Sequence, residues 1–163
     1  MIIIVSGLPG SGKSYFAARL ALKCDAVYIN SDKVRQELKS SGKYSLDDKL
    51  LVYKELRNRT AVLIEQNKDV VVDATFYHHT MREMFLELAK DYNQQIRVIE
   101  VTADEKIIKE RLLLPRKYSE ADFSVYETIR DSFEEITMPH LVLESTNDNI
   151  NLMLDSAVAY IGN

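Results

Sequence analysis

A glycine-rich loop between a hydrophobic run and a helical segment constrains this chain more than any other feature. The aliphatic run Met1–Ser6 leads directly into Gly7-Leu8-Pro9-Gly10-Ser11-Gly12-Lys13-Ser14. This is the pattern G-x-x-x-x-G-K-[ST] in the strand–loop–helix order that the motif requires. Glycines let such a loop turn its backbone N–H groups toward an anion, and the following helix adds the positive end of its dipole. The start of the chain is therefore predicted to bind nucleotide phosphates.

The residue types within this loop predict separate roles. We expect the Lys13 ammonium group to reach the β- and γ-phosphates, and the Ser14 hydroxyl to ligate Mg²⁺. ATP, or another nucleoside triphosphate, and Mg²⁺ are therefore the expected cofactors. The other residues predicted to contact the nucleotide are Gly7, Pro9, Gly10, Ser11, Gly12, Tyr15 and, much later in the chain, Arg111.

Composition excludes several other classes of protein. A chain of 163 residues is long enough for one domain with a full core, and we treat residues 1–163 as that domain. The net charge of −4 argues against coating of long nucleic acid, but allows a local basic cleft that grips nucleic-acid ends. The single cysteine, Cys24, excludes a disulfide framework. We find no leader pattern and no apolar run of membrane-spanning length, so we expect a cytoplasmic protein.

Hydrophobic runs alternate with helical patterns along the whole chain, which indicates an α/β layer architecture. The continuous apolar run 70–72 is typical of a parallel strand that is buried on both faces, and 96–101 is a further predicted strand. We expect further strands at 2–6, 26–29 and 141–144. Helices are expected over 15–22, 33–39, 46–66, 79–91, 106–114, 119–136 and 149–161. Pro115 interrupts one helix and Ser119 can cap the next, which predicts a short helical lid over about 112–125.

Polar clusters follow several of the predicted strands. In parallel α/β sheets ligands bind at the carboxyl ends of the strands, so these clusters should meet at one site. Asp73 closes an apolar strand and could hold Mg²⁺ through water or orient Arg35. The clusters are Asn30-Ser31-Asp32 with Arg35, Asp73-Ala74-Thr75, and the region around Arg111 and Arg116.

The segment Asn30-x-Asp32-x-x-Arg35-Gln36, at its distance from the phosphate loop, resembles the kinase domain of phage-type polynucleotide 5′-hydroxyl kinases. The resemblance implies that Asp32 is the general base on the acceptor hydroxyl and that Arg35 binds polar groups of the acceptor. Two further segments resemble the wider group of small P-loop kinases. They are the strand end 70–75 with Arg82 downstream, and residues 111–116 before Ser119. That group includes zeta-toxin-like, gluconate-type and antibiotic phosphotransferases.

This resemblance covers nearly the whole chain and refines the expected fold. It implies a three-layer P-loop NTPase fold with a five-stranded parallel sheet in the adenylate-kinase-like strand order, the first strand being central. Asp73, Thr75 and Arg82 are further candidates for binding the acceptor. Arg116 is the candidate lid arginine beside the transferring phosphoryl group. The chain departs from the group at Tyr15, where threonine is common, and in a spacing from Arg111 to Arg116 that is one residue longer.

Each candidate also has a purely structural interpretation. Asp32 can be a helix N-cap, because a carboxylate there satisfies backbone donors, and capping can coexist with catalysis. Arg35 and Arg82 can lie on solvated helix faces. Arg111 and Arg116 can complement a helix C-terminus. The three histidines, at 78, 79 and 140, have no metal-ligand spacing with cysteines or carboxylates, so the sequence predicts no metal site for them.

We expect the chain to be a kinase that moves the γ-phosphoryl group of ATP to a hydroxyl, and the favoured acceptor is a nucleic-acid 5′-hydroxyl. The alternative acceptor is a small molecule: a nucleoside, a sugar or an antibiotic. A nucleotide-binding switch or slow NTPase remains a second alternative. Such a switch needs a residue that positions the attacking water, and nothing after Asp73 obviously supplies one.

Overall fold

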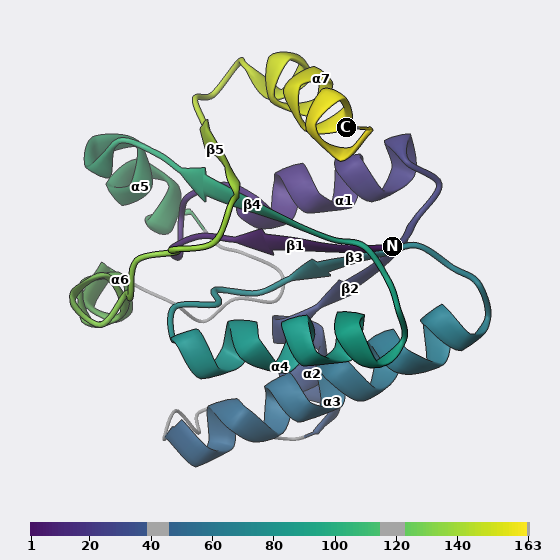
Figure 1. Ribbon diagram of the computed structural model, residues 1–163. Coiled ribbons are helices and arrows are strands. Elements are labelled where there is room, and N and C mark those ends of the chain that lie inside the picture. Colours follow the sequence, from purple (N-terminus) through teal and green to yellow (C-terminus); the bar gives the residue numbers. More distant parts are fainter. Residues whose placement is uncertain (39–45, 115–122, 163) are drawn as a thin grey trace.

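The chain forms a parallel β-sheet with helices on both faces (Figure 1). The computed structural model describes residues 1–38, 46–114 and 123–162. Within them lie five strands in the order β2-β3-β1-β4-β5, so the predicted fold class and central first strand are confirmed. Ile2 pairs with Val70 on one side and with Ile96 on the other. The strands are β1 (Ile2–Ser6), β2 (Val27–Asn30), β3 (Val70–Asp73), β4 (Ile96–Thr102) and β5 (Leu141–Glu144).

Two hydrophobic layers cover the sheet. Helices α1 (Lys13–Lys23) and α7 (Ile150–Ile161) pack on one face, where Ile3 and Val5 of β1 point. Helices α2 (Ser31–Glu37), α3 (Leu46–Glu65) and α4 (His79–Asp91) cover the other face, which receives Ile2 and Ile4 (Figure 1). Successive side chains of a strand point to opposite faces, so a strand buried on both must be apolar throughout.

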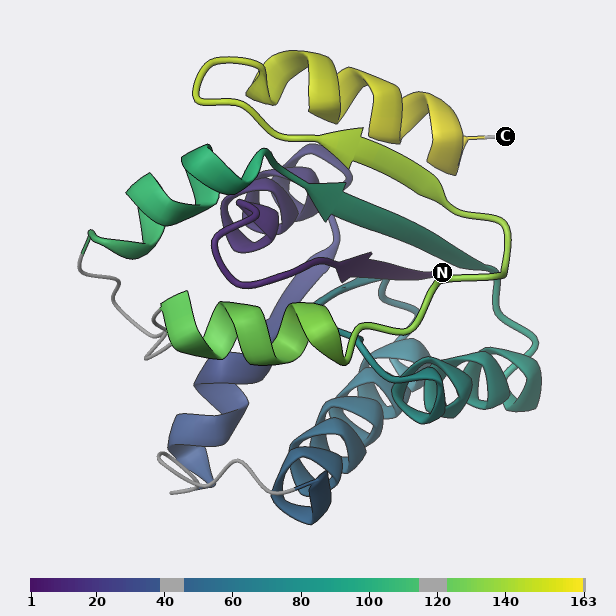
Figure 2. The same cartoon turned by 90° about the vertical axis from the view of Figure 1, so that its left-hand side faces the viewer.

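Two further helices lie beyond the carboxyl ends of the strands, α5 (Glu105–Leu112) and α6 (Phe123–Asp131). Figure 2 views the molecule from the side on which they lie. The predicted helix over 119–136 is wrong at its C-terminal end, because α6 ends at Asp131. The backbone beyond it is used in tertiary contacts, such as the Glu134 N–H donating to the Tyr77 carbonyl at 2.8 Å. Pro115 and the predicted cap at Ser119 fall outside the described residues.

In the segments that the structure places, every helix is too short or too polar to cross a membrane.

Candidate functional site

The glycine-rich loop joins β1 to α1 in a conformation that requires glycine. Gly7 and Gly12 have φ angles of 150° and 92°. A Cβ atom on Gly7 would lie 2.3 Å from the Val101 carbonyl oxygen, and one on Gly12 would lie 2.8 Å from the Ser145 hydroxyl. Both contacts are too close for a carbon atom, so a side chain at either position would force the loop to move. The loop is therefore held close to the ends of β4 and β5.

The start of α1 leaves backbone donors available to an anion. Gly12 is the N-cap residue, and among the described residues no side chain caps the helix there. The first turn of α1 carries no acidic side chain either. The first N–H groups of a helix have no partners inside it, and the helix dipole makes this end positive. Lys13 and Ser14 lie at this end, so the loop supplies amides, an ammonium group and a hydroxyl to one place.

Asp73 lies at the centre of a buried hydrogen-bond network behind the loop. Its carboxylate is fully buried, and its Oδ2 atom accepts from the Tyr28 hydroxyl at 2.7 Å and from Asn30 Nδ2 at 2.5 Å. Burial and then the Asp73 carboxylate raise the pKa of Tyr28, although hydrogen bonds from Asn30 and Ser14 oppose this. Tyr28 therefore stays protonated and donates to Asp73.

The other oxygen of Asp73 is a buried acceptor. Within the described part of the chain, Oδ1 of Asp73 is buried and has no hydrogen-bond partner. A buried acceptor normally has a partner, which can be protein, water or an ion. Magnesium prefers oxygen ligands and keeps several of its waters. The unpaired Asp73 oxygen and the nearby Ser14 hydroxyl are oxygen groups of the kind that Mg²⁺ or its bound water requires.

Asn30 links this network to Asp32. Its Oδ1 atom accepts from the backbone N–H groups of Asp32 and Lys33, at 2.9 Å and 3.1 Å, so Asn30 is the N-cap of α2. The interpretation that Asp32 is the N-cap of this helix is wrong. Asn30 is the N-cap because it ends β2 beside Asp73, and the Asp73 carboxylate holds the Asn30 amide group in place. Asp32 lies in the first turn of α2.

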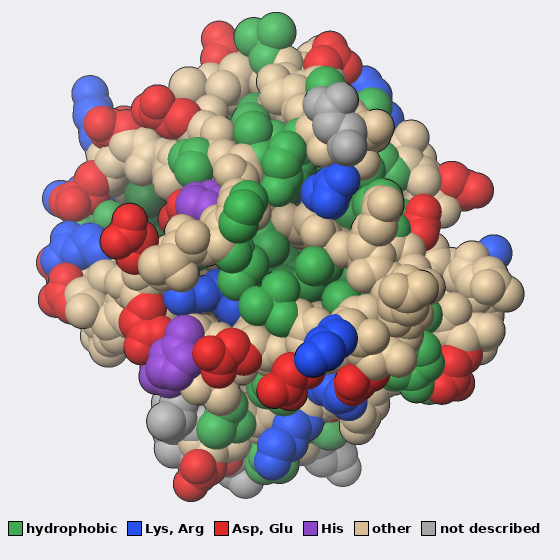
Figure 3. All heavy atoms as spheres, in the orientation of Figure 1, with side chains coloured by type: hydrophobic (Ala, Val, Ile, Leu, Met, Phe, Trp, Pro, Cys, Tyr) green, Lys and Arg blue, Asp and Glu red, His purple; other side chains and the backbone are tan. Residues whose placement is uncertain are grey.

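A pocket of about 1080 Å³ opens over the phosphate loop. On the surface seen in Figure 3, hydrophobic side chains gather at the centre of the face and charged ones surround them. The pocket brings Lys13, Ser14 and Asp32 together, although α1 and α2 cover opposite faces of the sheet. Its lining also includes Gly10, Gly12, Tyr15, Arg19, Tyr28, Asn30, Arg111, Leu114, Ser145, Thr146, Asn147 and Ile150.

Arg111 of α5 joins the phosphate loop to the connection between β5 and α7. Its guanidinium group donates to the carbonyls of Gly10 and Ser11, at 3.4 and 3.1 Å. It also donates to the Thr146 carbonyl at 2.8 Å and to Asn147 Oδ1 at 3.2 Å. Arg111 therefore fixes two segments of the pocket wall relative to each other.

Two predicted site residues that the structure describes, Thr75 and Arg35, do not line this pocket. The Thr75 carbonyl accepts from the Ser6 hydroxyl at 2.9 Å and from the Gly7 N–H at 3.4 Å, which fastens the phosphate loop to the end of β3. Arg35 is half-buried on α2 and is not among the described pocket residues. Arg116 falls outside the described residues, so its predicted role as a lid arginine stays a prediction.

Arg82 is buried beneath the turn that follows β3. Its guanidinium donates to the Phe76 carbonyl at 2.8 Å and to the carbonyls of Glu134 and Glu135, each at 3.1 Å. The interpretation that Arg82 lies on a solvated helix face is therefore wrong. Its side chain binds backbone carbonyls and does not line the pocket, and its predicted contact with the acceptor stays a prediction.

Replacing Arg82 by methionine should lower the free energy of unfolding by about 3 kcal/mol, because it leaves one buried and two partly buried carbonyl groups without this donor. Urea denaturation followed by circular dichroism would measure this loss. The matched control is Arg57→Met, which removes only a surface ion pair with Asp91 at 3.3 Å and should cost less than about 1 kcal/mol. Equal losses in the two variants would contradict the structural role of Arg82.

Sequence reasoning missed several residues of this site. Tyr28 looks like an ordinary strand residue, because its contact with Asp73 requires β2 and β3 to be neighbours. The loop formed by Ser145, Thr146 and Asn147 could have been found, because it is a polar run directly after a strand, like the other clusters.

The fold and the loop together define an α/β nucleotide-binding protein of the P-loop type. A family profile described as an AAA domain, AAA_33, matches residues 2–136, and the chain belongs to this family. The uncharacterized protein Rv2004c of Mycobacterium tuberculosis (strain ATCC 25618 / H37Rv) is 27% identical over 124 residues, covering 69% of this chain and 25% of that protein. The chain thus spans about a quarter of the length of the curated relatives it matches.

Solved structures share the fold over nearly the whole chain. A gluconokinase from Sinorhizobium meliloti 1021 has a TM-score of 0.73 at 18% identity, covering 96% of this chain and 89% of its own. The Mycobacterium tuberculosis APS kinase CysC, in complex with AMPPNP and APS, has a TM-score of 0.74 at 18% identity, covering 99% of this chain and 97% of its own. Chaetomium thermophilum Kti12, in complex with ADP-AlF3, has a TM-score of 0.67 at 20% identity, covering 98% of both chains. At these identities the likeness establishes the fold.

Proposed function

We propose that this chain is a kinase that transfers the γ-phosphoryl group of ATP to a hydroxyl group of an acceptor. The observation that carries the proposal is that Asp32 opens into the same pocket as Lys13 and Ser14, while Asn30 performs the capping. A carboxylate that is not needed for capping, and that faces a phosphate site, is placed to accept a proton. The kinases among the solved structures of the same fold support this reading.

The transfer can be written in terms of the residues that surround the pocket. The acceptor O–H gives its proton to the Asp32 carboxylate as its oxygen forms a bond to the γ-phosphorus. The bond from the γ-phosphorus to the β–γ bridging oxygen breaks, and ADP leaves. Lys13 and the loop amides stabilise the negative charge on the phosphate oxygens. Protein side chains do little covalent chemistry in such a reaction, so positioning matters most.

Magnesium belongs to this proposal through Ser14 and Asp73. Ser14 would contribute its hydroxyl, and Asp73 would hold a metal-bound water with its unpaired Oδ1 atom. When bound, the ion neutralises charge on the β- and γ-phosphates. Tyr28 and Asn30 donate to the other Asp73 oxygen, which orients the carboxylate for this task.

The first acceptor we propose is the 5′-hydroxyl of a nucleic acid, because the Asp32-x-x-Arg35 arrangement resembles that of polynucleotide 5′-hydroxyl kinases. Residues three apart lie on the same side of a helix, so Arg35 could hold the acceptor that Asp32 deprotonates. The second candidate is a small-molecule hydroxyl. A gluconokinase and an APS kinase of the same fold support it, as does the acidic net charge of −4.

A transfer screen with γ-labelled ATP and Mg²⁺ tests the proposal. The acceptors are 5′-hydroxyl oligonucleotides, nucleosides, sugars and aminoglycosides, and the expected result is label transfer to one of these classes. Transfer to a small molecule alone would replace the first acceptor with the second. Slow release of labelled phosphate without transfer to any acceptor would contradict the kinase proposal and favour an NTPase or switch.

Arg111→Met should weaken ATP binding by about tenfold, because the phosphate loop loses donors that hold the Gly10 and Ser11 carbonyls in place. Isothermal titration with a non-hydrolysable ATP analogue and Mg²⁺ would measure the change. Lys106→Met, on the exposed side of the same helix, is the matched control and should bind normally. Normal affinity in Arg111→Met would show that these contacts do not shape the nucleotide site.

A further inference from the structure

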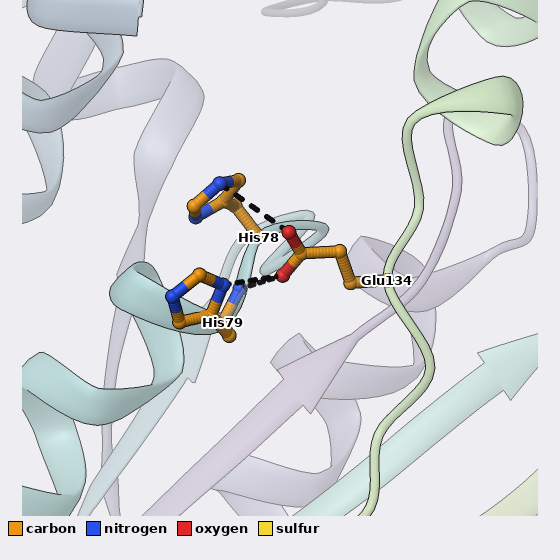
Figure 4. A group of neighbouring side chains, drawn as sticks. All are labelled: His78, His79 and Glu134. Atoms are coloured by element: carbon orange, nitrogen blue, oxygen red, sulfur yellow. Dashed lines mark hydrogen bonds and ion pairs between the residues drawn. The ribbon is translucent and has the colours of Figure 1, made fainter.

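Two histidines and a glutamate meet outside the nucleotide pocket (Figure 4). His78 and His79 stand at the start of α4, and Glu134 belongs to the connection between α6 and β5. His78 Nε2 lies 3.4 Å from Glu134 Oε1, and His79 Nδ1 lies 2.8 Å from Glu134 Oε2. The imidazole rings stack, with centroids 4.5 Å apart. The space-filling view in Figure 3 shows histidine side chains at the surface next to acidic ones, so an ion could enter from solvent.

The carboxylate is positioned by contacts that do not depend on the imidazole rings. The Glu134 N–H donates to the Tyr77 carbonyl at 2.8 Å, and the His79 backbone N–H donates to Glu134 Oε2 at 2.5 Å. Arg82 holds the carbonyls of Glu134 and Glu135. A ligand held this way loses little freedom when an ion binds.

We propose that His78, His79 and Glu134 form a binding site for a divalent transition-metal ion of the Zn²⁺ type. One ligand atom from each residue lies within 4.8 Å of the others. Nε2 of His78 and Nδ1 of His79 are the nitrogens that contact the carboxylate. Tetrahedral zinc with bonds of about 2.1 Å places its ligands about 3.4 Å apart. The His79 side chain is 57% exposed, so its ring can turn to close the remaining gap. Water completes the coordination.

The ligand types select this class of ion. Imidazole suits Zn²⁺, Cu²⁺ and Ni²⁺, whereas Mg²⁺ and Ca²⁺ prefer sites made of oxygen alone. The site is therefore chemically distinct from the Ser14 and Asp73 oxygens, which suit Mg²⁺. A magnesium ion bound beside the nucleotide would not compete for it.

Two contacts set a limit on the affinity. The Thr80 N–H donates to His78 Nδ1 at 3.3 Å, which places the ring proton of neutral His78 on Nε2. Metal binding at Nε2 moves that proton to Nδ1, and this long capping bond is lost. Arg82 also lies 4.0 Å from Glu134 Oε2 and repels a cation. With three ligands and these two opposing contacts, we expect micromolar binding, weaker than that of a structural zinc site.

Metal binding would tie two distant segments together. Glu134 precedes β5, and the histidines follow the turn at Thr75 that fastens the phosphate loop. Zn²⁺ should therefore raise the melting temperature of the whole chain, since an ion that binds only the folded state stabilises it by mass action.

The test is isothermal titration of the chelator-treated chain with ZnCl₂ in the presence of excess Mg²⁺. We expect one ion per chain with a micromolar Kd. His79→Ala and Glu134→Gln should each weaken binding at least tenfold and abolish the rise in melting temperature. His140→Ala is the matched control, because His140 lies elsewhere, 3.4 Å from Glu100, and should bind zinc normally. Circular dichroism of each variant shows whether it has folded.

Copper supplies a second measurement that does not depend on stability. Electron paramagnetic resonance of the Cu²⁺-loaded chain should show two coordinating nitrogens, falling to one in His79→Ala. The proposal is overturned if the wild type shows no saturable zinc binding, or if folded His79→Ala and Glu134→Gln bind zinc as the wild type does.

Discussion

Lys13→Ala is expected to lower phosphoryl transfer by about three orders of magnitude while the melting temperature stays close to that of the wild type. In the proposed reaction the ammonium group neutralises charge on the β- and γ-phosphates, so its removal would leave that charge without a partner. The side chain lines the pocket and lies outside both hydrophobic clusters, so the fold should not depend on it. Initial-rate measurements with labelled ATP and thermal unfolding would test both parts.

The matched control for this variant lies on the same helix. Lys23 ends α1 and pairs with Asp155 of α7 at 2.7 Å, far along the helix from the loop. Lys23→Ala should keep nearly full activity and lose less than about 1 kcal/mol of stability. Near-normal transfer by Lys13→Ala would show that the loop is not the phosphate site.

Asp32→Asn should lower kcat by about a hundredfold or more without unfolding the protein. The amide keeps the approximate shape of the side chain but cannot accept the acceptor's proton. Because Asn30 caps α2, the substitution removes no capping interaction, and the melting temperature should change little. Slow ATP hydrolysis should persist, since water can reach the γ-phosphate without Asp32. Steady-state kinetics with the acceptor from the transfer screen would separate kcat from KM.

Glu37→Gln is the control for this variant. It makes the same chemical change on the same helix, at a surface carboxylate that pairs with Arg59 at 2.6 Å. It should transfer phosphate at the wild-type rate.

Arg35→Ala should instead raise KM for the acceptor and leave the affinity for ATP close to normal. Wild-type transfer by Asp32→Asn would remove Asp32 as the base, and Asp73 would become the next candidate.

Much of the fold follows from local patterns. The run Ile2–Val5 and the run Val70–Val72 are apolar at every position, which only strands buried on both faces require. The glycine-rich loop needs glycines for its own backbone angles. Its place between a strand and a helix could therefore be predicted from the sequence motif. These features depend on neighbours in sequence, and for that reason the α/β class and the parallel sheet were predictable.

Other features needed residues that are distant in sequence. Asp32 is a reasonable N-cap on local grounds, but Asn30 takes that role because Asp73 on the neighbouring strand holds its amide group. The pattern after residue 131 continues as a helix, yet Arg82 and Tyr77 bind the backbone at Glu134 and end it. In both cases a tertiary hydrogen bond outweighs a local conformational preference, which contributes little free energy by itself.

The phosphate loop, most of each strand, and Asp32 and Asp73 as candidate site residues can be recognised in the sequence alone. What those two carboxylates face depends on the tertiary structure. It buried Asp73 behind Tyr28 and Asn30, and it turned Asp32 toward the phosphate loop. It also brought Glu134 beside His78 and His79. The physical reason is that local patterns report burial and backbone angles, whereas the partner of a polar group depends on which distant segments the fold makes neighbours.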